Sequence, residues 1–486
     1  MRDVSPHPHR WRILAITLCV TFMGLLDVTI VNIALPAIDA DFGGSTASLQ
    51  WVVSGHALAF GLILVTGGRL GDALGRRRMM LIGLVCFVAT SAGCGLAPSI
   101  GWLIAARFAQ GISAGLLVPQ NSGIIQNVFS GPERGRAFGY MGMAVGISGS
   151  IGPVLGGLII GLAGGDGGWR WIFLVNVPIG LALIGAVWRI IPGREPGSGK
   201  PDLDIIGAAL LGLTVLALLF PISSVEQGFG PEFAIITLAP ILGALTVWWE
   251  RRIIRRGRAP LLNIPLLRAT KGYATGMAVG LLYFCGFTGV LLIYSIYLQS
   301  GLGFTPLHAG LLITPFAISS AIAAPIAGRL VARGGRMTTV GALVILIVGL
   351  ALAATLIPLT EGTALAIPTQ IATMTLAGFG AGGVVGPNMT MTLANVPPRM
   401  GGAAGAAVQT AQRIGNAIGA AVLLLVYSQA LALTHDAGAG LRAVWATAIV
   451  FFLAAIAVAL TDSRSPTRSK RANAPSEEER RVRRHT

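Results

Sequence analysis

The chain has 486 residues, of which 54% are hydrophobic and only 11% carry a charge. Soluble domains usually carry about a quarter charged residues, so this composition excludes a soluble globular protein and indicates an integral membrane protein. The formal net charge is +16, because 35 Lys and Arg outnumber 19 Asp and Glu. In a membrane protein such a surplus belongs to cytoplasmic loops, so we expect no nucleic-acid partner.

Fourteen apolar runs follow one another along the chain, each about 20 residues long and able to cross a bilayer as a helix. They cover residues 13–35, 51–71, 79–97, 101–123, 136–162, 169–191, 204–224, 232–250, 272–296, 308–331, 337–358, 366–391, 401–427 and 440–461. With the N-terminus inside, 30 of the 35 basic residues fall on the cytoplasmic side of these runs. This asymmetry predicts a multi-pass protein of the cytoplasmic membrane with both termini in the cytoplasm.

A repeat divides the chain into two halves. The stretch 68–76, GRLGDALGR, recurs after the tenth run as 328–336, GRLVARGGR, at an offset of 260. Runs one to six therefore match runs nine to fourteen, and runs seven and eight are inserted between them. This 6+2+6 plan predicts an all-α membrane protein with four parts: an N-terminal half (1–195), an insertion with its linking loops (196–270), a C-terminal half (271–461) and a disordered cytoplasmic tail (462–486).

Five motifs carry a family resemblance. They are LLDVTIVNIALP (25–36), GGRLGDALGRRRMML (67–81), LIAARFAQGISAG (103–115), GISGSIGPVLGG (146–157) and WRWIFLVNVPIG (169–180). Together they resemble the fourteen-helix drug:proton antiporter family of the major facilitator superfamily. The resemblance implies the major-facilitator fold, export of drugs and protons as the coupling ion.

Asp27 is the acid buried deepest in the first run, about 14 residues or 21 Å from its cytoplasmic start. Burying an acid in a bilayer costs at least about 2.5 kcal/mol, so Asp27 requires a partner or a watery cavity. Arg107 and His56 belong to the same outer half of the membrane and are candidate partners. The resemblance implies that Asp27 and Arg107 couple to protons. The alternatives are a purely structural Asp27–Arg107 pair and a His56 that is only a packed polar residue.

The loop after the second run is a candidate conformational latch. A carboxylate beside arginines, or at a helix N-terminus across the interface, could hold the two halves together on the cytoplasmic side. The residues of this latch are Gly68, Asp72, Gly75, Arg76 and Arg77. The alternative is a solvated loop whose arginines only fix the topology. In the second copy Ala332 replaces the acid, so we expect a weaker latch there.

The fifth run carries a glycine stripe at three- and four-residue spacing, which makes a smooth face for tight helix packing. The resemblance implies that part of this stripe seals the cavity against proton leak, whereas the alternative is an ordinary close contact. The residues of this antiporter seam are Gly149, Gly152, Pro153, Gly156 and Gly157.

Four polar residues are candidates for the central cavity: Asn32, Gln110, Arg413 and Asn416. Arg413 lies deep in the thirteenth run and could instead pair with a helix C-terminus. No Asp or Glu falls inside runs nine to fourteen, which weakens the case for doubly charged cations as substrates.

We expect no enzyme and no cofactor, because Walker-type, HExxH and GxSxG patterns are absent from the sequence. The sequence predicts a monomeric, proton-coupled exporter of hydrophobic or cationic drug-like compounds or antibiotics. The alternatives are a narrow exporter of one endogenous metabolite, antibiotic or lipid, and a non-transporting scaffold or sensor. We also expect contacts with membrane lipids, because the basic link 248–258 would lie against anionic headgroups.

Overall fold

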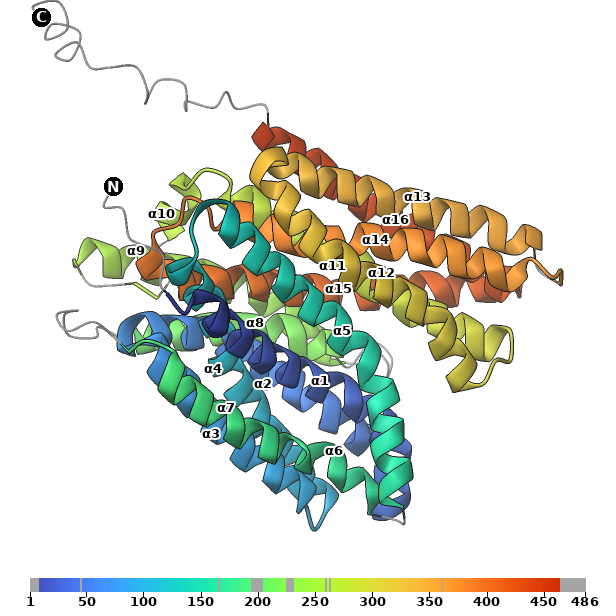
Figure 1. Cartoon of the computed structure of the whole chain (residues 1–486), viewed down its shortest axis with the longest axis horizontal. Helices are drawn as coiled ribbons and strands as arrows, with labels where there is room; N and C mark the ends of the chain where they lie inside the picture. The colour runs from blue at the N-terminus through green and yellow to red at the C-terminus, as the bar shows by residue number, and fades with distance from the viewer. Residues whose placement is uncertain are drawn as a thin grey trace, which may run out of the picture.

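The computed structural model describes residues 8–43, 46–164, 167–193, 204–223, 231–257, 260–261, 264–360 and 362–463, and within these ranges the chain is helical without strands (Figure 1). The first part contains α1 (Arg10–Phe42), α2 (Thr46–Leu74), α3 (Arg76–Gly95), α4 (Ile100–Val128), α5 (Gly131–Ala163), η1 (Gly168–Arg170), α6 (Trp171–Leu174) and α7 (Asn176–Ile190). The middle part contains α8 (Ile205–Ser223), η3 (Pro231–Thr237), α9 (Leu238–Arg255) and α10 (Ile264–Ala269). The last part contains α11 (Tyr273–Ile296), η4 (Tyr297–Gly301), α12 (Pro306–Gly334), α13 (Arg336–Thr360), α14 (Ala366–Thr392), η5 (Pro398–Met400), α15 (Gly401–Thr434) and α16 (Ala437–Ser463).

Each predicted apolar run coincides with a helical segment, although several boundaries differ. The fifth helix begins at Gly131 rather than 136, and α1 continues past Pro36 to Phe42. In the described part of the chain, ten helical segments are long and apolar enough to cross a membrane. The structure is therefore an all-helical membrane protein, while the count of fourteen spans stays a prediction. The predicted tail, 462–486, lies almost entirely outside the described residues, as does most of the link 194–203.

The helices form two bundles, α1–α7 and α11–α16, which we call the N-half and the C-half (Figure 1). Each half has its own apolar core. One core joins Phe87, Leu117 and Val187 of the N-half, and another joins Leu343, Met374 and Phe452 of the C-half. The halves meet chiefly along two helix pairs, α2 with α15 and α5 with α12, beside smaller contacts of α4 with α15 and of α5 with α14. We call the two main pairs the first seam and the second seam.

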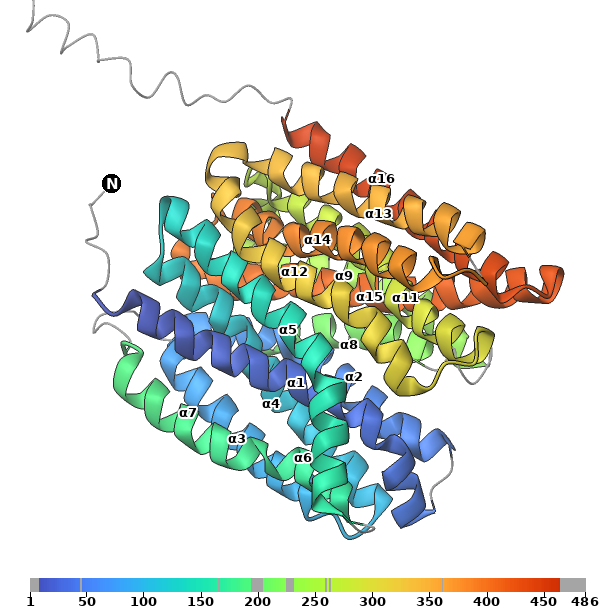
Figure 2. The same ribbon diagram turned by 45° about the vertical axis from the view of Figure 1, so that its right-hand side comes forward.

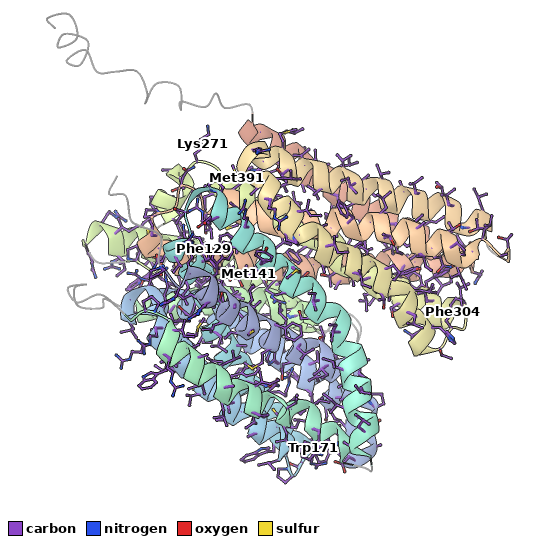
Figure 3. The ribbon with its side chains drawn as sticks, viewed as in Figure 1. Phe129, Met141, Trp171, Lys271, Phe304 and Met391 are labelled. Carbon is purple, nitrogen blue, oxygen red and sulfur yellow. The ribbon has the colours of Figure 1, made fainter. Side chains whose placement is uncertain are left out.

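In the described structure the halves are joined most closely at one end, which we call the joined end. A shared core there contains Phe129 and Phe138 of the N-half and Met389 and Leu393 of the C-half. Figure 3 shows Phe129, Met141 and Met391 toward this end. Trp171 lies at the other end of the N-half and Phe304 at the other end of the C-half, and in this view these two ends are well separated. Figure 2 shows the same divergence from a second angle. The joined end carries the arginine-rich loops and is the end that the sequence predicts to face the cytoplasm.

The inserted helix α8 packs against both halves at the first seam. It contacts α2 and α15, and Val215 of α8 shares a small apolar cluster with Leu58 of α2 and Ile414 of α15. The second inserted helix, α9, packs on α8 and ends in a group of arginines. The insertion therefore covers the first seam from the side.

Candidate functional site

Asp27 lies on α1 in a sealed polar cluster inside the N-half, and only 1% of it is exposed. Its Oδ2 accepts a hydrogen bond of 2.6 Å from Arg107 Nη1 of α4, which is also a salt bridge. Its Oδ1 accepts one of 3.0 Å from Gln110 Nε2 and one of 2.9 Å from Asn176 Nδ2 of α7. Both carboxylate oxygens of this buried acid are therefore occupied by hydrogen-bond donors.

The donors of this cluster are themselves fixed by neighbouring helices. Arg107 Nη1 also donates to Gln110 Oε1 at 2.7 Å, and Arg107 Nε donates to the Val52 carbonyl of α2 at 3.1 Å. Gln110 Nε2 donates a further bond of 2.7 Å to Ser91 Oγ of α3. The cluster thus links α1, α2, α3, α4 and α7, and a change of charge on Asp27 would act on all five helices.

His56 of α2 lies beside this cluster and is 2% exposed. Its Nδ1 has no hydrogen-bond partner among the described residues. A methyl group built on Gly111 of α4, the residue after Gln110, would lie 2.3 Å from the His56 carbonyl oxygen. His56 is therefore near the predicted proton site but makes no hydrogen bond to Asp27 in the described structure, so its role as a proton partner stays a prediction.

Arg413 of α15 is the deep cation contributed by the C-half. Its guanidinium carbon lies 4.9 Å from the centre of the Phe60 ring of α2, in the other half. Within the described residues it has no carboxylate partner. A cation–π contact contributes roughly 0.5–2 kcal/mol, whereas placing an arginine at the centre of a membrane helix costs roughly 2.5–3.5 kcal/mol. The Phe60 contact alone therefore does not account for a charge at this depth.

The other cavity candidates fall in three different environments. Gln110 belongs to the Asp27 cluster rather than to an open cavity. Asn416 of α15 is half-buried and accepts a hydrogen bond from Thr288 of α11. Asn32 of α1 is exposed. The structure therefore does not gather the four candidates into one site.

Asp72 joins the halves at the first seam, and its side chain is 1% exposed. Arg76 Nη2 lies 2.7 Å from Asp72 Oδ1, and the same nitrogen donates to the Pro398 carbonyl of the C-half at 2.6 Å. The backbone N–H groups of Gly402 and Ala403 donate to Asp72 at 3.1 and 2.9 Å. These two groups belong to the first turn of α15, where backbone N–H groups have no partner within the helix and favour an anion.

The other latch candidates have different surroundings. Gly68 brings the backbones together, since a methyl group there would lie 2.6 Å from the Gly402 carbonyl oxygen. Gly75 makes the turn between α2 and α3 with a φ of +102°, a conformation that favours glycine. Arg77 donates to the Trp188 carbonyl of α7, within the N-half. Arg77 is therefore placed away from the seam.

The second seam has the same close backbone approach but no carboxylate. A methyl group at Gly328 of α12 would lie 2.5 Å from the Gly135 carbonyl oxygen, and one at Gly135 would lie 2.6 Å from the Gly328 carbonyl. Arg336, the counterpart of Arg76, donates to Asn388 Oδ1 and to the Gly272 carbonyl, each at 2.9 Å. These acceptors lie in its own half, so they do not tie the halves together.

The residues of the predicted antiporter seam lie along α5, and their role in sealing the cavity stays a prediction. Gly152 and Gly156 pack against Thr29 and Ile30 of α1, within the N-half. Gly149 and Gly157 have no neighbouring atom within 4 Å of a methyl group built on them. Pro153 lies inside α5, and its side chain is outside the described part of the structure. The α5 glycines that meet the C-half lie nearer the joined end.

The family model described as Major Facilitator Superfamily matches residues 17–420 and 276–485. The chain belongs to the major facilitator superfamily. It is 36% identical over 446 residues to the probable actinorhodin transporter of Streptomyces coelicolor, covering 90% of this chain and 76% of that protein. It is 36% identical over 435 residues to the puromycin resistance protein pur8 of Streptomyces alboniger, covering 88% and 84%. It is also 33% identical over 420 residues to the multidrug resistance protein Stp of Mycobacterium tuberculosis, covering 85% and 75%.

Solved structures agree with this assignment of the fold. The human organic anion transporter MFSD10 superposes with a TM-score of 0.67 at 18% identity, covering 93% of this chain and all of that one. The proton:xylose symporter XylE superposes with a TM-score of 0.64 at 16% identity, covering 92% and 94%. This member of the superfamily is therefore a membrane transporter and not an enzyme.

The structure places at these sites several residues that the sequence analysis did not single out. Asn176 lies within the motif 169–180 and binds Asp27. Its polar side chain in an otherwise apolar stretch could have indicated such a buried contact. Ser91 carried no such signal, because serine is common in membrane helices. Gly135 and Gly139 have the GxxxG spacing of close helix contacts, and the repeat already marked Gly328 as the counterpart of Gly68.

Proposed function

We propose that this transporter exports drug-like or antibiotic compounds from the cell in exchange for protons. The observation that carries the proposal is the Asp27 cluster, a single deep acid held by Arg107 at 2.6 Å and by two side-chain amides. The named functions of the relatives, transport of actinorhodin, resistance to puromycin and multidrug resistance, support the substrate class.

Protonation of Asp27 would change the cluster in a defined way. A proton on Oδ2 removes the negative charge that Arg107 neutralises and leaves its guanidinium with weaker acceptors. The amide groups of Gln110 and Asn176 lose a charged acceptor at the same time. Because the cluster links five helices, proton uptake would loosen the junction between α1 and its neighbours. That coupling of a proton to a helix rearrangement is what an antiporter requires.

We propose fourteen spanning helices in a 6+2+6 arrangement, a cytoplasmic-membrane location with both termini inside, and a monomer. Arginines at the end of α9, among them Arg251, Arg255 and Arg256, are exposed where the chain would meet anionic headgroups.

The test is the Asp27→Asn variant in proteoliposomes with an imposed pH gradient. Asparagine keeps the size of the side chain but cannot titrate. We expect gradient-driven drug export to fall to the background rate, while drug affinity changes by less than about tenfold, or 1.4 kcal/mol. Export and binding are measured on the same preparation.

A matched control is Asp41→Asn, which removes an acid at the outer end of the same helix. Asp41 pairs with Arg170 at 2.6 Å and is partly exposed. We expect this variant to retain gradient-driven export. Export at the wild-type rate by Asp27→Asn would show instead that the pair with Arg107 is only structural.

A further inference from the structure

Arg413 occupies the face of α15 that meets the N-half. Along this helix Gly402 contacts Gly68, Ala406 contacts the same glycine, and Gln409 donates to Ser122 of α4 at 3.1 Å. These positions and Arg413 follow one another at intervals of four, three and four residues, which places them on one helix face. Arg413 is thus the next position beyond the joined end, where the halves begin to diverge.

The acids near the membrane interior are already paired elsewhere. Asp27 is held by Arg107 at 2.6 Å and Asp72 by Arg76 at 2.7 Å, and both side chains are almost fully buried. Arg413 has no carboxylate partner among the described residues and is half-buried over the Phe60 ring. Arg413 is therefore a positive charge that faces the N-half and has no matching anion in the described part of the chain.

We propose that Arg413 selects the charge of the substrate, and that the transporter prefers planar aromatic anions carrying a carboxylate or phenolate group. This inference rests on the proposed export function and narrows its substrate class. It departs from the sequence-based expectation of hydrophobic or cationic drugs.

Two features of the Arg413 environment fit such a ligand. A guanidinium binds a carboxylate through two parallel N–H donors, which gives a stronger and better oriented contact than a point charge. The Phe60 ring is buried and lies against this guanidinium, so the surface left for a flat aromatic molecule to stack on is the plane of the guanidinium itself. A cation entering the same place would meet the like charge of Arg413.

The experiment compares two dyes that share a xanthene ring system but differ in charge: fluorescein, an anion, and rhodamine 123, a cation. Binding to purified protein is followed by fluorescence anisotropy, and export is followed in proteoliposomes. The variants are Arg413→Gln and Arg413→Lys, and the control is Arg442→Gln. Arg442 is exposed and pairs with the exposed Asp436 on the outer side, away from the seams.

We expect the wild type and Arg442→Gln to bind and export fluorescein, and Arg413→Gln to bind it at least about tenfold more weakly. Arg413→Lys retains the charge without the two parallel N–H donors of a guanidinium, so its fluorescein affinity is expected to lie between those of the wild type and Arg413→Gln. Rhodamine 123 binding is expected to be unchanged or stronger in Arg413→Gln. If Arg413→Gln does not fold, Arg413→Lys and the wild-type preference between the dyes still decide the result.

The outcomes separate this inference from the function on which it rests. Export of rhodamine 123 without export or binding of fluorescein would overturn the inference and leave drug export intact. Equal fluorescein affinity in the wild type and Arg413→Gln would also overturn it. Export of neither dye, nor of any drug tested, would count against the proposed function, while loss of fluorescein binding in Arg413→Gln would still support an anion site.

Discussion

The first and second seams are built on one packing plan and differ in charge. In each, a glycine of the repeated stretch approaches a backbone carbonyl of the opposite half, Gly68 at Gly402 and Gly328 at Gly135. Among the described residues, only the first seam adds a carboxylate, Asp72, which receives hydrogen bonds from two backbone N–H groups and an arginine. The repeat has therefore kept the close helix contact on both sides and the charged contact on one.

The difference in charge between the seams has two causes. One is the missing acid, and the other is where the partner helix begins. In the first seam α15 begins at Gly401, so the N–H groups of Gly402 and Ala403 are free to bind Asp72. In the second seam α5 begins at Gly131, about one turn before Gly135 meets Gly328. The N–H groups of α5 at that contact are already used within the helix. A charged latch needs the acid and the helix N-terminus together.

The largest effect is expected from Asp72→Asn. The change leaves Arg76 without its carboxylate and weakens the bonds from Gly402 and Ala403, and removing one partner of a buried pair costs about 3–5 kcal/mol. We expect the joined end to open more often and transport to fall by tenfold or more. The readout is labelling of a cysteine placed at Ser122, which is fully buried behind the seam, by a membrane-impermeant maleimide.

Alkylation of that cysteine in Asp72→Asn at the wild-type rate would show that Asp72 does not hold the seam closed. The four native cysteines, two of them exposed, are replaced in both backgrounds first.

A smaller and equal effect is expected from Gly68→Val and Gly328→Val. Each side chain would collide with a backbone carbonyl of the opposite half, and overpacking of this kind costs about 1–3 kcal/mol. Because the two contacts are equivalent, we expect similar losses of transport and of thermal stability. Gly149→Val is the control, since its methyl position has no atom within 4 Å. A strong effect of only one seam variant would contradict the equivalence of the packing.

The smallest effect is expected from Ala332→Asp, which restores the acid to the second copy of the repeat. Ala332 is exposed, so a carboxylate there would not be buried between the halves as Asp72 is. We expect transport and cysteine labelling to stay within about twofold of the wild type, a difference of less than 0.5 kcal/mol. A marked slowing of labelling would show that the acid alone makes a latch.

The sequence predicted contacts best for buried charges, because a buried charge needs an oppositely charged or hydrogen-bonding partner and few such partners are near. Counting residues placed Asp27 and Arg107 in the same half of the membrane, and the structure joins them at 2.6 Å. The expectation of a carboxylate beside an arginine or at a helix N-terminus corresponds to both contacts of Asp72.

Glycine contacts were harder to predict, because a glycine stripe identifies a smooth face without identifying the helix that covers each turn of it. Along α5 the neighbour changes from α12 at Gly139 to α1 at Gly152, since the halves diverge between these positions. The partner of each glycine therefore depends on the angle between the halves, which no local pattern encodes.

The position of α8 makes the two sides of the transporter unequal toward the lipid. Because α8 lies across α2 and α15, acyl chains on that side meet the insertion instead of the contact between the halves. The side formed by α5 and α12 carries exposed apolar residues such as Ile318 and Ile322. Of the two seams, the one between α5 and α12 is therefore the one that the described inserted helices leave uncovered, so the two halves of the pseudo-symmetric molecule are flanked unequally.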